Sequence, residues 1–215
     1  MSGASVRTDM KRPAFWLGWC AALAACGGGG AMGDDDGGGD DVPADASGGG
    51  DGAGGGDEDR RLYPLEEGRV WSYDVTSTYP SCPGGRRDHR VIGKGTTDGR
   101  EAFRVSSYCG LTITTSAEGN RVETFYDFGP RGWYRYLDEP VEDGRTWTTT
   151  NGSATFTQTY EQLGAYEGHE GCWKITQNVS YTSYWIHCEG VGLVHAEMID
   201  LGGGVIRARL VEQNF

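Results

Sequence analysis

The sequence predicts an all-β fold: a single antiparallel meander, curled or closed into a partly open barrel, that follows a disordered N-terminal linker. Two observations predict it. Short segments alternate apolar and polar residues with a period of two, and turn-forming dipeptides separate these segments. No stretch of residues 60–215 shows a helical period beyond one or two turns. We therefore expect three parts: residues 1–25, residues 26–59 and an all-β domain over residues 60–215.

Four segments of the domain carry the strand pattern. In residues 70–76, the side chains of Trp71, Tyr73 and Val75 fall on one face, as in a half-buried strand. Residues 103–105, 154–160 and 173–176 repeat the alternation. We expect about nine or ten strands in all, a number at which an open sheet tends to curl or close.

Turn dipeptides separate these segments. Asp98-Gly99, Gly119-Asn120, Asp143-Gly144 and Asn151-Gly152 are residue pairs that supply the positive φ angles of tight hairpins. The nearest candidate for a helix, residues 161–163, is too short to change the fold class.

The N-terminal 25 residues have the pattern of an export signal. Lys11 and Arg12 end a basic stretch, and an apolar run over residues 14–25 follows. These 12 residues fit the apolar region of a signal peptide and are too few to cross a bilayer as a helix. An ordinary secretory signal, cut elsewhere, is the simpler alternative.

The end of the apolar run, Leu23-Ala24-Ala25-Cys26, resembles the lipobox of bacterial lipoprotein precursors. This resemblance implies cleavage before Cys26 and acyl chains on that residue, so that the protein's partner is a membrane, reached through those chains. Two or three chains anchor a protein stably, whereas one gives only marginal binding. In many Gram-negative bacteria the residue after the cysteine directs sorting, and Gly27 favours the outer membrane over the inner one.

Residues 27–59 form the expected linker. They include 15 glycines and 10 acidic residues, with no basic residue and almost no apolar side chain. Such a segment cannot bury enough apolar surface to offset the entropy lost on ordering. Calcium binding by the aspartates is the alternative, but a calcium-binding solenoid needs a regular apolar position that this segment lacks.

Charge excludes one class of partner. The chain has a formal net charge of −12, although residues 60–215 contain 20 acidic and 16 basic residues and are only mildly acidic. Proteins that bind nucleic acid usually present a basic patch or stripe, so we expect no nucleic-acid partner.

The domain contains four cysteines: Cys82, Cys109, Cys172 and Cys188. An even number in an exported chain predicts two disulfides. Cys172 and Cys188 are equidistant from Ser180, the centre of an expected hairpin, and we pair them. By elimination, Cys82 pairs with Cys109, which requires the loop that carries Cys82 to fold back. The alternative is a zinc site built from Cys172, His187, Cys188 and His195, but its Cys–Cys spacing does not match zinc modules.

Catalytic motifs are absent from the sequence: it contains no Gly-x-Ser-x-Gly, His-Glu-x-x-His or phosphate-binding glycine loop. The four histidines are His89, His169, His187 and His195, and the last two bracket a turn and could meet in space. The carboxylate pairs Asp138-Glu139 and Glu142-Asp143 flank Pro140, and we expect them to be solvated turn residues. We therefore expect no catalytic residues, no cofactor and no resident metal.

The ends of the domain carry a second resemblance. Tyr63-Pro64-Leu65, Gly68 and Trp71-Ser72-Tyr73 open it, and Gly190-Val191-Gly192-Leu193-Val194 lies near its close. This pattern is similar to a group of uncharacterised secreted bacterial β-rich domains, which implies export and a β fold but no activity. We expect Pro64 to start an edge strand, Trp71 to enter the core, and Gly190 and Gly192 to let the sheet turn a corner.

Two functions remain open. The first is a non-enzymatic envelope lipoprotein that presents a β domain for binding or structural support, with an envelope protein or an apolar small molecule as partner. The second is a secreted hydrolase whose histidine and carboxylate residues are distant in sequence. The abundant tryptophans and tyrosines either fill the core or line an apolar cavity. A filled core or an apolar cavity favours the first function, whereas a deep pocket with converging histidine and carboxylate residues favours the second.

Overall fold

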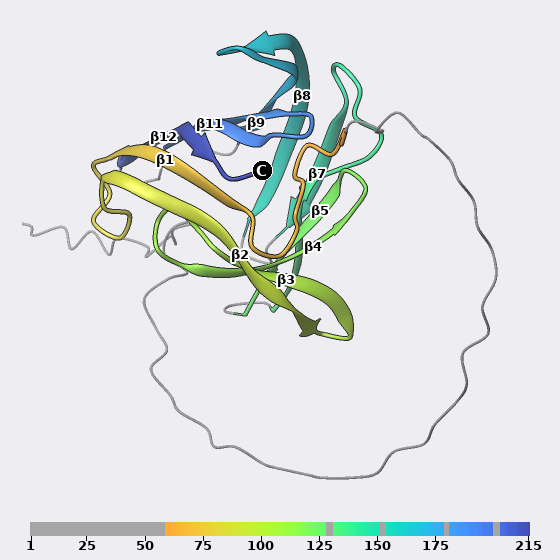
Figure 1. Cartoon of the computed structure of the whole chain (residues 1–215). Helices are drawn as coiled ribbons and strands as arrows, with labels where there is room; N and C mark the ends of the chain where they lie inside the picture. The colour runs from red at the N-terminus through yellow and green to blue at the C-terminus, as the bar shows by residue number, and fades with distance from the viewer. Residues whose placement is uncertain (1–58, 128–130, 151–153, 179–180, 200–202) are drawn as a thin grey trace, which may run out of the picture.

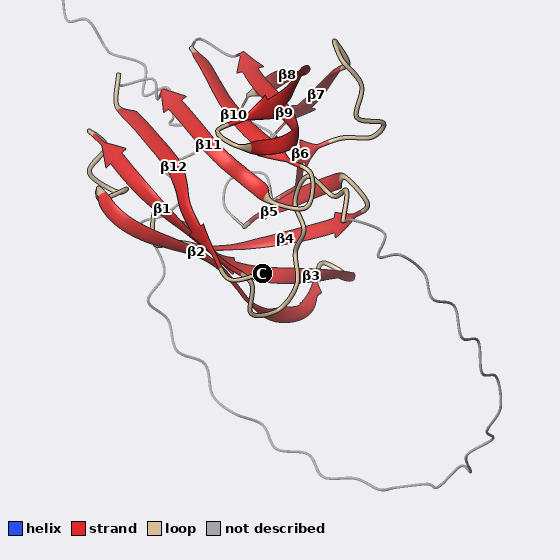
Figure 2. Ribbon diagram, turned by 45° about the horizontal axis from the view of Figure 1, so that its top comes forward, coloured by secondary structure: helices blue, strands red, loops and turns tan. Residues whose placement is uncertain are grey.

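The structure, a computed structural model, describes residues 59–127, 131–150, 154–178, 181–199 and 203–215. Within these ranges the regular structure is all strand, and the strands curve around a shared interior (Figure 2). The twelve strands are β1 (Val70–Ser77), β2 (Gly85–Thr97), β3 (Arg100–Ser106), β4 (Thr112–Glu118), β5 (Arg121–Tyr126), β6 (Gly132–Leu137), β7 (Thr146–Thr150), β8 (Thr155–Tyr166), β9 (His169–Asn178), β10 (Thr182–Cys188), β11 (Gly192–Ile199) and β12 (Val205–Gln213).

All twelve strands belong to one antiparallel sheet with the order β6-β5-β4-β3-β2-β1-β12-β11-β10-β9-β8-β7. Consecutive strands pair throughout, except that β6 and β7 do not pair and β1 pairs with β12. Figure 1 shows β1 and β12, from the two ends of the domain, side by side. The predicted all-β meander, curled into a partly open barrel, is therefore confirmed, and its first and last strands lie in the middle of the sheet.

The strand count is higher than the nine or ten expected. Residues 161–163, the nearest helical candidate, lie inside β8, which continues as a strand to Tyr166. The expected turns at Asp98-Gly99, Gly119 and Gly144 are present, with positive φ angles at each. The Asn151-Gly152 turn lies outside the described residues.

The core lies on the concave face of the sheet. The alternation read from residues 70–76 is confirmed, since Trp71 and Tyr73 are fully buried and Val75 is nearly so. Burial of these large side chains stabilises the fold by roughly 25 cal/mol for each Å² of apolar surface removed from water. Trp71 also donates its indole N–H to the carbonyl of Val191 at 2.6 Å, so the core joins β1 to the turn before β11.

Gly190 and Gly192 occupy the corner where β10 turns into β11. Their φ angles are +70° and +94°, a region that side chains other than glycine rarely adopt. A Cβ on Gly192 would lie 3.0 Å from the indole nitrogen of Trp71. The structure places the hairpin turn between β10 and β11 at these glycines, where the sequence led us to expect a corner of the sheet. Glycine is required there both for its backbone and for its lack of a side chain.

The gap between β6 and β7 is closed by side chains instead of a strand ladder. The backbone N–H of Arg135 donates to Thr149 Oγ1 at 3.0 Å. Arg145 binds the carboxylate of Asp138 at 2.8 Å, and the Tyr160 hydroxyl donates to the Asp138 carbonyl at 2.9 Å. The expectation that Asp138 is a solvated turn residue is wrong, because it is buried and paired at this seam.

One end of the barrel is covered by the residues that precede β1. We call residues 59–69 the plug; Figure 1 draws it in orange between the grey trace and β1. Leu62 and Leu65 are buried in it. The Leu62 N–H donates to Asn120 Oδ1 at 2.6 Å in the β4–β5 turn, and the Gly190 N–H donates to the Arg61 carbonyl at 3.0 Å in the β10–β11 turn. Both turns lie at the same end of an antiparallel sheet.

The plug corrects the role expected for Pro64, which starts no edge strand. It lies in the irregular plug, and its carbonyl accepts a hydrogen bond from Arg69 at 2.9 Å. The sequence pattern quoted for the start of the domain includes this segment. It did not show that this segment folds across the barrel end.

The two disulfides pair the cysteines as expected. Cys172 bonds to Cys188, and the two residues are opposite each other in the β9–β10 register. Cys82, in the loop between β1 and β2, bonds to Cys109, in the loop between β3 and β4. These two loops lie at the end of the barrel opposite the plug, because the strands alternate in direction.

Candidate functional site: a cavity inside the barrel

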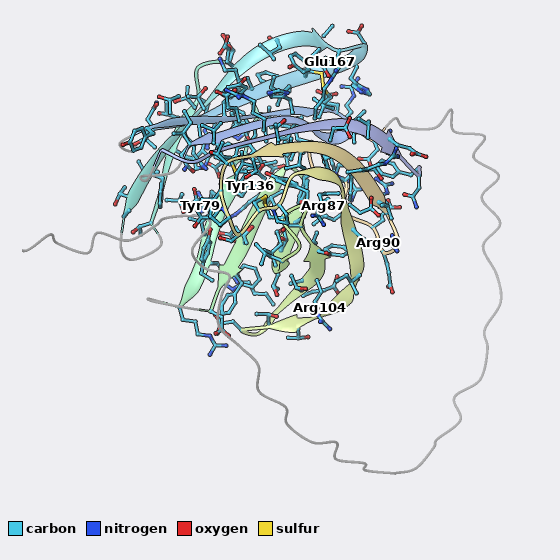
Figure 3. All side chains as sticks on the ribbon, turned by 90° about the vertical axis from the view of Figure 1, so that its left-hand side faces the viewer. Tyr79, Arg87, Arg90, Arg104, Tyr136 and Glu167 are labelled. Carbon is cyan, nitrogen blue, oxygen red and sulfur yellow. A yellow bond between two sulfur atoms is a disulfide. The ribbon has the colours of Figure 1, made fainter. Side chains whose placement is uncertain are left out.

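The sheet encloses a cavity of about 550 Å³. Its floor is formed by Tyr63 of the plug and His89 of β2, and its inner walls include Tyr136, Trp185, Leu193 and Met198. Figure 3 labels Tyr136 inside the ring of strands and Arg90 and Arg104 on its outer side. The aromatic residues therefore have both roles considered from the sequence: some fill the core, and others line a hollow.

At the floor of the cavity, a tyrosine and a histidine from distant parts of the chain meet. The Tyr63 hydroxyl and His89 Nε2 are 2.6 Å apart. His89 Nδ1 is buried and has no hydrogen-bond partner within the described residues. Trp71 packs edge-on against the His89 ring, with centroids 5.4 Å apart, so the imidazole is held in place by packing as well as by its one hydrogen bond.

A second tyrosine–histidine pair lies beside the first. His187 Nδ1 is 2.8 Å from the carbonyl of Leu62, and the Tyr136 hydroxyl is 2.8 Å from His187 Nε2. A carbonyl oxygen can only accept, so Nδ1 carries the proton and Nε2 accepts from Tyr136. This bond from β10 to the plug fixes the tautomer of His187.

Burial keeps these groups uncharged. Desolvation, together with the neighbouring His187, lowers the pKa of His89 to about 3, and desolvation lowers the pKa of His187 to about 4. Desolvation also raises the pKa of Tyr63 and of Tyr136 well above the ordinary tyrosine value. At neutral pH both pairs are therefore neutral hydrogen-bonding groups.

The opposite end of the cavity is its mouth. Ser107, Cys109 and Leu111 of the β3–β4 loop line it, and Asp127 and Arg131 line it from the β5–β6 connection. The Cys82–Cys109 disulfide therefore ties one lip of the mouth to the β1–β2 loop. Asp127 and Arg131 pair with each other at 3.1 Å, and both are well exposed.

The histidines expected to be able to meet do not do so. His187 points into the barrel, whereas His195 lies on the outer face, where its ring stacks on Tyr184 with centroids 5.6 Å apart. An irregular register between Ile186 and His187 accompanies this placement.

The alternative zinc site is not formed. Cys172 and Cys188 are joined in a disulfide, so the site has neither thiolates nor converging ligands. Over the described ranges, no group of three or more histidine, cysteine or acidic residues is placed to hold a metal.

Several predictions concern residues outside the described ranges. Cys26, the lipobox and the acidic linker with its alternative calcium site lie outside the described residues, except for Asp59 at the end of the linker, which pairs with Arg61 and Arg69. In the part of the chain from residue 59 onward that the structure describes, no helix is long and apolar enough to span a bilayer.

The floor of the cavity was not recognised from the sequence. Tyr63 and His89 are 26 residues apart, and Tyr136 and His187 are 51 apart. Neither separation is a motif, because pairing across a barrel depends on how the sheet curls. The one available signal was Tyr63 itself, which belongs to the quoted pattern at the start of the domain.

Comparison with known proteins gives no family assignment. No protein-family model matches the chain, and no curated protein matches it. Two solved structures resemble it. One is a candidate lipoprotein from Parabacteroides distasonis, with 12% sequence identity and a TM-score of 0.33; the match covers 72% of this chain and 99% of that one. The other is a candidate exported protein with a YmcC-like fold from Bacteroides fragilis, with 12% sequence identity and a TM-score of 0.38; the match covers 73% of this chain and 100% of that one. TM-scores this low do not establish a shared fold or function.

Proposed function

We propose that this chain is an exported, lipid-anchored binding protein of the cell envelope, whose barrel holds a small, largely apolar molecule. The observation that carries the proposal is the cavity, whose volume of about 550 Å³ lies in the range of small-molecule sites, roughly 300–1,000 Å³. Aromatic and aliphatic side chains with a few polar groups form its walls, as in sites that bind such molecules.

The position of the mouth supports a binding role. The plug, which follows the linker, closes one end of the barrel, and the mouth lies at the other. With Cys26 acylated, the linker would join the membrane to the plugged end. The open end would then be free to exchange ligand with the surrounding compartment.

The hydrolase alternative has less support. A catalytic histidine normally needs an orienting partner and a suitable pKa. The hydrogen bonds of His89 and His187 go to tyrosine hydroxyls and to a backbone carbonyl, and burial lowers both pKa values far below neutrality. We therefore propose that these residues support the cavity and do not catalyse a reaction.

A fluorescent probe tests the proposal. N-phenyl-1-naphthylamine is uncharged and becomes bright in apolar surroundings. It is titrated into the full chain carrying Cys26→Ser, so that neither detergent nor bilayer takes up the probe. We expect saturable binding at one site per chain. Thr124→Trp places a large ring on the cavity wall and should weaken binding at least tenfold.

The matched control is Thr157→Trp, on the exposed side of β8 and outside the cavity. It should bind the probe as the parent chain does. If the probe fails to bind, or binds equally to the Thr124→Trp chain, the proposed function is wrong.

A further inference from the structure

The charges around the cavity limit which molecules it can hold. Its lining consists of aromatic, aliphatic, hydroxyl and thioether side chains, together with the disulfide-bonded Cys109, His89 and the Asp127–Arg131 pair. His89 is buried and its one hydrogen bond goes to the Tyr63 hydroxyl. The inner part of the cavity therefore offers a ligand no formal charge.

The two charged residues of the lining are at the mouth and neutralise each other. Arg131 Nε lies 3.1 Å from Asp127 Oδ1, and the side chains are 63% and 78% exposed. The Arg131 guanidinium also lies over the ring of Phe125, 5.2 Å from its centroid. Both side chains are exposed, so a charged ligand that paired with either of them would do so at the solvent-facing mouth, where ion pairs contribute little.

The aromatic rings of the inner wall also form a defined apolar surface. Tyr136 contacts Trp185 edge-on, with centroids 5.9 Å apart, and Tyr63 contacts Tyr136 in the same way at 6.2 Å. Such rings favour contact with apolar groups and with other rings. A buried charge with no counterion, by contrast, loses its hydration without compensation.

We propose that the cavity selects uncharged apolar molecules and excludes their anionic and cationic analogues. This inference rests on the proposed function, because it assigns a chemical class to the ligand of the same cavity. It distinguishes this protein from carriers that hold the charged head of a fatty acid or an amine inside a barrel. The neutral tyrosine–histidine pairs are the structural basis of that distinction.

Three naphthalenes of nearly equal size test the inference: 1-naphthalenemethanol, which is neutral, 1-naphthoate, which is an anion, and 1-naphthylmethylammonium, which is a cation. Each competes with N-phenyl-1-naphthylamine for the full Cys26→Ser chain at pH 7. We expect the alcohol to displace the probe at concentrations at least tenfold lower than either ion does.

Two further variants, Arg131→Gln and Asp127→Asn, test whether the charged pair at the mouth contributes to selection. Both residues are exposed, so the substitutions should not prevent folding. In both variants the alcohol should still displace the probe at lower concentrations than either ion does, and the Thr157→Trp chain, changed outside the cavity, should match the parent chain. If the anion or the cation displaces the probe as well as the alcohol does, or better, the inference is wrong. If the anion displaces the probe from the parent chain but not from the Arg131→Gln chain, the anion binds at the mouth. In those cases the probe still binds and the proposed function stands. If the probe itself does not bind, both proposals fail.

Discussion

His187 shows how one buried side chain can hold an element in place. Its Nδ1–H group donates to the Leu62 carbonyl in the plug, and its Nε2 accepts from Tyr136 on β6. One neutral imidazole therefore joins β10, β6 and the plug. A protonated imidazole could keep the bond to Leu62, but its second N–H would have to face the Tyr136 hydroxyl as a donor. Protonation would therefore reverse the bond to Tyr136 and place a charge in a buried site, where the loss of hydration disfavours it.

This effect of protonation predicts lower stability in mild acid. In the unfolded chain His187 has an ordinary pKa near 6.5, whereas in the folded chain burial lowers the pKa of His187 to about 4 and that of His89 to about 3. Between these values the unfolded state binds more protons, so the free energy of unfolding falls as the pH falls below about 6.5. Each pKa unit corresponds to about 1.4 kcal/mol, so we expect His187 alone to account for about 2 kcal/mol between pH 7 and pH 5.

Urea unfolding at pH 7, 6 and 5 measures this dependence, in a range where carboxylates of ordinary pKa contribute little. His187→Gln should lower the stability at pH 7 and reduce the pH slope by about one proton. A variant slope equal to that of the parent chain would show that His187 is not buried in its neutral form.

At the scale of the element, the two ends of the barrel are held by different means. The plug is attached by hydrogen bonds and by the buried side chains of Leu62 and Leu65. The mouth is held by the Cys82–Cys109 disulfide, which joins the β1–β2 loop to a loop that lines the cavity. The other disulfide, Cys172–Cys188, lies on the outer face with Ile186 and Val194.

Removing each disulfide should therefore have different effects on binding. The cysteines of the Cys82–Cys109 bridge are 27 residues apart in sequence, and those of the Cys172–Cys188 bridge are 16 apart. For loops of these lengths the chain-entropy model gives a stabilisation of about 3 kcal/mol for each bridge. The Cys82→Ser, Cys109→Ser chain should lose about this much stability. It should also bind N-phenyl-1-naphthylamine several-fold more weakly, because the β3–β4 loop at the mouth of the cavity is no longer tied to the β1–β2 loop.

The Cys172→Ser, Cys188→Ser chain is the control. It should lose a similar stability, measured by chemical unfolding, while its affinity for the probe changes less than twofold. Equal losses of affinity in the two variants would mean that overall stability, and not the lip, controls binding.

At the scale of the whole molecule, the sheet is closed by an unusual seam. Its first and last strands pair in the middle, so the free edges belong to β6 and β7, which are neighbours in sequence. Edge strands left open invite aggregation. Here the buried Asp138 joins the two sides of the gap through its ion pairs to Arg135 and Arg145 and through the hydrogen bond that its carbonyl accepts from Tyr160.

The anchor is the other property of the whole molecule, and it predicts where the protein is found. Replacing Cys26 with Ser removes the sulfur that the acyl chains need, so we expect the chain to leave the membrane fraction and to stop incorporating labelled palmitate. The parent chain, fractionated in parallel, should remain bound. A Cys26→Ser chain that stays in the membrane and still takes up palmitate would contradict the lipoprotein assignment.

Much of the architecture could be predicted from local patterns. The alternation in residues 70–76, the turn at Asp98-Gly99 and the symmetric placement of Cys172 and Cys188 depend on neighbours along the chain or across one hairpin, and the structure agrees with each. Asp138 was misassigned because two of its partners, Arg145 and Tyr160, lie beyond the end of β6, across the seam. Pro64 was misassigned because an irregular segment and an edge strand look alike in sequence.

The sequence by itself determined the all-β class, the cysteine pairing and the expectation of an export signal, since hydrophobic period, turn chemistry and short motifs are local properties. The tertiary structure alone decided that the barrel is hollow, that the plug closes one end, and that Tyr63 meets His89 while His187 and His195 lie on opposite faces. The physical reason is that sheet curvature and register set which distant side chains share an interior, and both arise from the packing of the whole sheet.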